Sequence, residues 1–207
     1  MLKTWFLTGD WFIMDRQVTI SVVNPPDWAA VAINPSTPAI GLGNTWQETM
    51  ASLVIACHDR APAEPYILKL KAELPAVKHV SSAVAIVDIV LTPEWQPYID
   101  VYTETPNLIT PPGETTNVTF TITNKGNGWT LIQTEIQDIP GWSLDIDPAQ
   151  FMVDIGQSED TILHIRPPAT FFGVQSINLS FTPTRFDESG SPVPVTIQAG
   201  YSGFHKP

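Results

Sequence analysis

Apolar and polar residues alternate along most of the chain, in short runs that proline and glycine separate. The stretches 18–22 and 132–136 are examples, each with Val, Ile or Thr at every second position. A period of two residues places the apolar side chains on one face of a β-strand. The 20 prolines exclude long helices. Strand-length runs about every ten residues therefore predict an all-β chain of the β-sandwich type.

The pattern occurs twice along the chain. Trp28 and Trp142 lie 114 positions apart, and each directly follows a turn that contains proline. A proline, a glycine and three more strand-like runs follow each tryptophan in the same order. The matching landmarks are Pro35 with Pro148, Gly43 with Gly156, 53–55 with 162–165, 68–72 with 177–181, and 83–91 with 193–197. Two tandem sandwiches are therefore predicted, at 1–94 and 98–200, with a linker or tail at 201–207.

Two prolines, Pro93 and Pro97, flank the short polar stretch between the two copies. Prolines this close together restrict the backbone, so a stiff joint is predicted. We therefore expect two sandwiches arranged as a rod rather than two domains on a loose linker.

The copies differ at their beginnings. Copy two opens with a strand at 98–103 and a turn before its second strand, and the 114-residue offset aligns Thr115 with Met1. Copy one is therefore predicted to lack its N-terminal strand, with Met1–Met14 forming the second. A signal peptide is the weaker reading of Met1–Met14, because Asp10 interrupts the apolar run and no small-residue cleavage site follows. Either the chain is a fragment of a longer protein, which we favour, or another chain supplies the missing strand.

The turns of copy two form a recognisable series. They are Pro112-Gly113-Glu114, Asn124-Lys125-Gly126-Asn127, Pro140-Gly141-Trp142, Pro148, Gly156 and Pro167-Pro168. Copy one keeps Pro26-Asp27-Trp28, Pro35, Gly43 and Ala61-Pro62, but has Asp10-Trp11-Phe12-Ile13 in place of the Asn-x-Gly-Asn turn.

This series resembles the NEW3 family, the alpha-galactosidase-associated modules related to CARDB-like adhesion domains of archaeal and bacterial surface proteins. The resemblance implies that both sandwiches are immunoglobulin-like. It also implies a stalk, spacer or adhesion role outside the cell, and it brings no catalytic residues.

Composition argues against several classes of site and function. The chain has 207 residues, a formal net charge of −11 and one cysteine, which excludes an intramolecular disulfide and a multi-cysteine zinc site. An acidic chain is poorly suited to bind nucleic acid, whose phosphates need a basic surface. It has no run of 18 apolar residues, so no membrane span is predicted.

Aromatic and asparagine residues supply the candidate sites. Trp46 lies in a loop, Gly43–Gln47, that copy two lacks, and it is the predicted ligand-facing aromatic, since rings stack on the apolar faces of sugars. Trp28 and Trp142 are predicted to pack at turns or in cores. The sequons at Asn117 and Asn178 place both asparagines on outward strand faces, where glycans can be attached if the chain is exported.

The remaining chemistry-bearing residues predict no catalytic or metal site. Strand alternation points Cys57 into the core and His58 outward, so the two cannot act as a nucleophile and its base. Asp145 and Asp147 are expected to point outward as acidic surface, and the histidines lack metal-ligand spacing. No cofactor is expected.

Three hypotheses follow. The first is a non-catalytic stalk or adhesion module of a larger extracellular or cell-surface protein, whose partners are other domains of that protein or neighbouring surface proteins. The second is an accessory carbohydrate-binding module of a secreted enzyme, with polysaccharide as its ligand. The third is a filament subunit completed by a strand from its neighbour.

Overall fold

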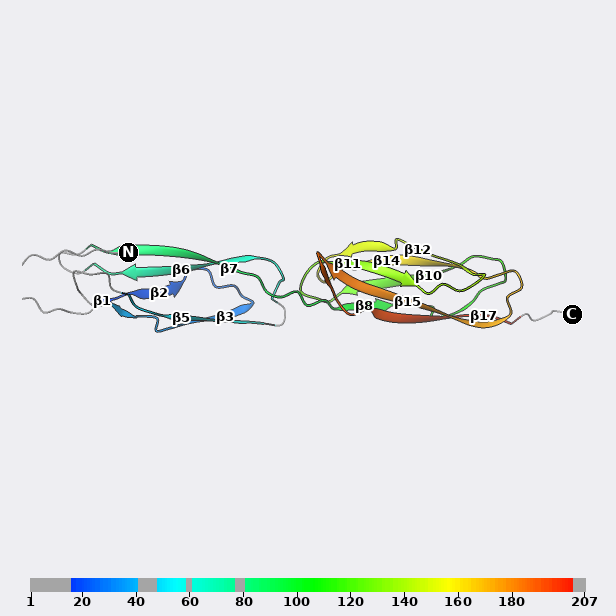
Figure 1. The fold of residues 1–207 in the computed structure, drawn as a ribbon, viewed down its shortest axis with the longest axis horizontal. Coiled ribbons are helices and arrows are strands. Elements are labelled where there is room, and N and C mark those ends of the chain that lie inside the picture. Colours follow the sequence, from blue (N-terminus) through cyan, green and yellow to red (C-terminus); the bar gives the residue numbers. More distant parts are fainter. Residues whose placement is uncertain (1–15, 41–47, 59–60, 77–80, 203–207) are drawn as a thin grey trace, which may run out of the picture. The chain divides into compact units, whose positions relative to one another are not determined.

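The computed structural model describes residues 16–40, 48–58, 61–76 and 81–202. Every regular element in these ranges is a β-strand, which confirms the predicted all-β fold class (Figure 1). The described residues accordingly include no helix able to cross a bilayer. The chain divides into two compact units, unit 1 at Met1–Pro93 and unit 2 at Glu94–Pro207.

Unit 2 consists of two β-sheets. One has the strand order β12 (Ser143–Asp147), β14 (Ser158–Arg166), β10 (Thr116–Asn124) and β8 (Ile99–Tyr102). The other has the order β13 (Gln150–Val153), β11 (Thr130–Ile136), β15 (Gly173–Arg185), β17 (Val193–Tyr201) and β9 (Asn107–Ile109), with β16 (Glu188–Ser189) paired to β15. Neighbouring strands are antiparallel except β17 and β9, which are parallel.

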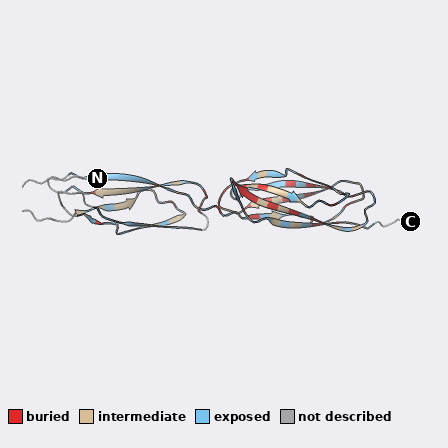
Figure 2. Ribbon diagram, viewed as in Figure 1, coloured by how far each residue is buried: buried red, intermediate tan, exposed pale blue. Residues whose placement is uncertain are grey.

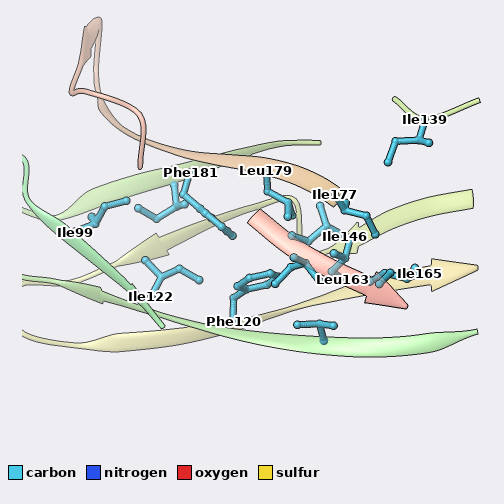
Figure 3. Close-up of a cluster of buried hydrophobic side chains, with 14 of the residues drawn as sticks. Ile99, Phe120, Ile122, Ile139, Ile146, Leu163, Ile165, Ile177, Leu179 and Phe181 are labelled. Atoms are coloured by element: carbon cyan, nitrogen blue, oxygen red, sulfur yellow. The ribbon is translucent and has the colours of Figure 1, made fainter. Parts of the chain in front are cut away.

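The two sheets enclose one hydrophobic core of fifteen buried side chains (Figure 3). Phe120 of β10 and Phe181 of β15 are fully buried, and their ring centroids lie 5.4 Å apart. Along β10 the buried residues Val118 and Phe120 alternate with the exposed Asn117. The inward and outward faces that the alternation predicts for this strand are therefore confirmed.

The turn Asn124–Asn127 ties several segments of unit 2 together. The fully buried side chain of Asn124 donates to the carbonyls of Gly128 and Val153, both at 2.9 Å, and accepts from the Gly126 N–H at 2.9 Å. Lys125 Nζ donates to Asp100 Oδ2 at 2.6 Å, which raises the pKa of this exposed lysine above its ordinary value.

Asn127 connects the same turn to the beginning of unit 2. Its Oδ1 accepts from the Gln96 N–H at 2.7 Å, and its Nδ2 donates to the Glu94 carbonyl at 2.9 Å. A Cβ at Gly126 would lie 2.7 Å from the Gln96 carbonyl oxygen, so this position must be glycine. Trp95, in the stretch so held, is buried. The stretch 94–97, predicted as part of an interdomain joint, thus belongs to unit 2.

Unit 1 contains shorter sheets. Its strands are β1 (Arg16–Gln17), β2 (Thr19–Val22), β3 (Ala29–Asn34), β4 (Ala39–Ile40), β5 (Ser52–Cys57), β6 (Tyr66–Leu74) and β7 (Ala83–Leu91). Within the described ranges they pair as β2-β6-β7, β3-β5 and β1-β4, all antiparallel. The predicted strand at Met1–Met14 lies outside the described residues.

The pairings of unit 1 repeat those of unit 2 in the same order. The β2·β6, β6·β7, β3·β5 and β1·β4 ladders correspond to β11·β15, β15·β17, β12·β14 and β11·β13. Pro35 and Pro148, which the sequence aligns, both follow cis peptide bonds. Burial differs, because the described residues of unit 1 include only four buried hydrophobic side chains, those of Ala61, Ala63, Leu68 and Leu74 (Figure 2).

Candidate functional site

An open hollow of about 400 Å³ lies on unit 2, on the outer side of the sheet that contains β11, β15 and β16. Trp129 directly precedes β11, and Leu131 and Gln133 follow at alternate positions along it. The turn between β15 and β16 supplies Phe186 and Asp187. The complete lining is Trp129, Leu131, Gln133, Thr184, Arg185, Phe186, Asp187 and Ser189. Strands of one sheet and the turn that joins two of them therefore build the whole site.

Phe186 is the most prominent side chain of this hollow. It is 81% exposed and has a φ of 50°, in the left-handed region. Phe186 and Asp187 connect Arg185 and Glu188, which are paired across the hairpin. A hairpin turn of two residues needs positive φ at its first position, where glycine or asparagine is the usual choice. A phenylalanine there is a strained arrangement of the kind concentrated at binding sites.

Three side chains hold the aromatic part of the hollow together. The rings of Trp129 and Phe186 meet edge to face, with centroids 5.2 Å apart. The guanidinium carbon of Arg185 lies 5.1 Å from the Trp129 centroid and 5.4 Å from the Phe186 centroid. Arg185 is buried, so its cation contacts both rings with little competition from water. Trp129 and Arg185 thus hold the exposed Phe186 ring in place.

Polar groups line the same hollow as the two rings. Gln133, Asp187 and Ser189 contribute an amide, a carboxylate and a hydroxyl, while the Thr184 hydroxyl is engaged with the Leu131 carbonyl at 3.1 Å. An exposed ring with donors and acceptors around it can stack on the apolar face of a sugar ring and hydrogen-bond its hydroxyls. The arrangement can bind and orient such a ligand.

Trp46, the aromatic predicted to face a ligand, lies outside the described residues. Trp28 and Trp142 are half-buried, and each meets another ring edge to face, Trp28 with Tyr66 at 5.6 Å and Trp142 with Phe171 at 4.7 Å. The prediction that both tryptophans pack against the protein is confirmed.

Both sequon asparagines are exposed on outward strand faces, as predicted. Asn117 Oδ1 lies 2.8 Å from His164 Nδ1. Asn178 donates to Gln137 Oε1 at 2.7 Å and accepts from the Thr196 hydroxyl at 2.9 Å. Glycosylation at either position stays a prediction.

The prediction for Cys57 is wrong. It is exposed rather than buried, although Leu53 and Ile55 on the same face of β5 are half-buried. The burial of this face decreases toward the last residue of the strand, where the described residues do not cover Cys57. His58 is exposed as expected.

The acidic residues of β12 follow their prediction. Asp145 and Asp147 are exposed and flank the buried Ile146. Among the described residues, no three His, Cys, Asp or Glu side chains gather closely enough to hold a metal ion.

Sequence reasoning did not find the hollow. Trp129 and Phe186 are 57 positions apart, and only the pairing of β11 with β15 brings them together. One signal was present in the sequence: Arg185-Phe186-Asp187-Glu188 joins two strands without the glycine or asparagine that such a tight turn favours.

Comparison with known proteins identifies no family for this chain. No protein-family model matches it, and no curated protein matches it. Membership of the NEW3 family therefore stays a prediction.

Several solved structures are similar at low identity. A protein of unknown function from Porphyromonas gingivalis W83 is 15% identical, with 91% of this chain and 87% of that chain covered and a TM-score of 0.38. WR4, a C. elegans MSP family member, is 12% identical, with 49% and 97% covered and a TM-score of 0.35. Domains 4 and 5 of the S-layer protein SbsC are 13% identical, with 80% and 91% covered and a TM-score of 0.32. At these values the similarities transfer neither activity nor partner to this chain.

Proposed function

We propose that this chain is a non-catalytic module of an extracellular or cell-surface protein, with a stalk, spacer or adhesion role of the NEW3 kind. The observation that carries the proposal is the repetition of one set of β-ladders in two compact units. Repeated sandwiches extend a protein by adding similar domains, each with its own core.

The surface chemistry supports the same proposal. The net charge of −11 keeps an exposed protein soluble. The outer face of unit 2 carries polar pairs across its strands, such as Ser176 with Gln198 and Asn178 with Thr196. Its partners would be other domains of the same protein or neighbouring surface proteins.

The location can be tested on intact cells of the source organism. Protease added to the medium should remove the chain, detected with an antibody against unit 2, while a cytoplasmic marker survives. Digestion only after lysis would contradict an exposed location.

Glycosylation of the two sequons can be measured in the same preparation. Mass spectrometry should detect an attached glycan on peptides that contain Asn117 or Asn178.

A second function, binding of polysaccharide, is favoured by the hollow at Trp129 and Phe186. The Phe186 ring is exposed, its backbone is strained, and the buried Arg185 contacts it. The ring therefore presents an aromatic face to solvent and is not part of the core of unit 2.

Binding can be measured by affinity electrophoresis and a glycan array. Phe186→Ala and Trp129→Ala should each weaken binding about fivefold to thirtyfold, since a lost stacking contact and its buried surroundings cost about 1–2 kcal/mol. Phe172→Ala is the matched control, because Phe172 is an equally prominent phenylalanine, 74% exposed, outside the hollow. Trp46→Ala tests the loop aromatic that the sequence proposed. Equal binding by Phe186→Ala and Phe172→Ala would exclude the hollow as the site.

A further inference from the structure

The last strand of unit 1 presents an open edge. In the part of the chain that the structure describes, β7 pairs only with β6. The corresponding strand of unit 2, β17, is covered on its other side by β9, which pairs with Gln198–Gly200. Leu68 pairs with Ile89 in the β6·β7 ladder, and Ile177 pairs with Ile197 in the β15·β17 ladder. When these two pairs are aligned, the stretch of β17 that β9 covers corresponds to 90–92 of unit 1.

The outer face of β7 is apolar except at Asp88, which lies on the same face as Val84, Ile86 and Val90. Val84, Ile86 and Val90 on β7 are all more than half exposed, and Ile67 of β6 lies directly opposite Val90. Figure 2 shows β7 as exposed along most of its length. The corresponding face of unit 2 is polar: Gln198 occupies the place of Val90, and it bonds Ser176 across the strands. Exposed apolar patches of this kind mark interaction surfaces.

β7 also lacks the features by which edge strands usually avoid pairing. It is nine residues long and contains neither proline nor lysine, whereas β17 contains Pro194. Its one charged residue, Asp88, is neutralised within the same sheet by Lys69, whose Nζ lies 2.9 Å from Asp88 Oδ1. A second strand with the same sequence would therefore meet no unbalanced like charge.

The sequence of β7 is complementary to itself in antiparallel register. If Val87 lies opposite its own copy, Val84 faces Val90 and Ala85 faces Ile89, which are apolar pairs on matching faces of the sheet. The same register places Ile86 opposite Asp88, whose carboxylate is ion-paired with Lys69 of its own sheet. We infer that two copies of this chain pair through β7 about a twofold axis, joining two β2-β6-β7 sheets into one continuous sheet. This inference is independent of the proposed function, since it concerns unit 1 alone and not where the chain resides.

The association state is measured by sedimentation equilibrium on the full chain, from low micromolar concentrations to about 200 μM. The unmodified chain should show a reversible monomer–dimer equilibrium. A chain that stays monomeric over this range overturns the inference.

Two double variants test the register. V84K/V90K places lysine opposite lysine at both symmetric positions and should raise the dimer dissociation constant at least about tenfold. V84K/V90E places lysine opposite glutamate instead and should restore dimerisation. Within one strand, positions 84 and 90 are too far apart for their side chains to interact, so pairing of the introduced lysine with the introduced glutamate requires a neighbouring copy.

Val54→Lys is the control, because Val54 is 58% exposed, as Ile86 is, but lies on β5 in a different sheet. It should leave the dimer unchanged. Circular dichroism of each variant verifies that unit 1 remains folded. Equal dimerisation by V84K/V90K and Val54→Lys, or failure of V84K/V90E to restore the dimer, overturns pairing through β7 in this register.

Discussion

At the scale of single residues, Asn124 stabilises unit 2 more than its small size suggests. Its side chain satisfies two carbonyls and one N–H at the end of β10, where strand pairing stops. A buried polar group that loses its partner costs about 1–3 kcal/mol. One asparagine therefore replaces a set of backbone hydrogen bonds that the turn cannot otherwise make.

Asn124→Ala should consequently lower the free energy of unfolding of unit 2 by about 3 kcal/mol. Urea titration followed by tryptophan fluorescence measures the change. Asn117→Ala, at an exposed asparagine on the same strand, should change stability by less than about 0.5 kcal/mol. Equal losses in the two variants would contradict the role of Asn124.

Phe186 allows backbone strain to be measured separately from ring contacts. Phe186→Ala and Phe186→Gly both remove the ring, but only glycine adopts a φ of 50° without cost. The glycine variant should therefore be more stable than the alanine variant by about 1 kcal/mol, the reverse of the usual order. A more stable alanine variant would show that the turn carries no strain. Both variants should lose polysaccharide binding alike.

At the scale of elements, alternation predicted strands well where one face is covered by a second sheet. The faces of β10 and β12 follow the sequence pattern because Phe120 and Ile146 have a core to enter. Cys57 does not follow it, because burial there depends on what other segments cover, which a strand's own sequence does not contain. The hollow could not be predicted from the sequence for the same reason, because the pairing of β11 with β15 decides which residues lie next to Trp129.

The beginning of unit 2 is an element-scale prediction of its own. The sequence places the second sandwich at 98, whereas Glu94 and Gln96 bond Asn127 and Trp95 is buried. Removing 94–97 from an isolated unit 2 should therefore cost about 3 kcal/mol, from lost aromatic burial and two lost hydrogen bonds. Thermal unfolding of 94–202 and 98–202 gives the difference, and 92–202 is the control that should match 94–202. Equal stability of all three would exclude 94–97 from the folded unit.

At the scale of the whole molecule, the described residues of the two units form hydrophobic cores of unequal size. Unit 2 buries fifteen hydrophobic side chains in one cluster, while the described residues of unit 1 bury four. Buried apolar area dominates the stability of a domain. A common order of strand pairing therefore does not imply a common stability.

Unfolding of the full chain should accordingly occur in two steps, with unit 1 first. Hydrogen exchange with mass spectrometry along a urea series resolves the order: peptides from β6 and β7 should lose protection at lower urea than those from β10 and β14. Isolated 94–202 should show one transition that coincides with the second step. If β7 pairs with its copy, the first step moves to higher urea as protein concentration rises, since association stabilises only the folded form, and the second step stays fixed. A single transition for all four strands would mean that the two units unfold as one.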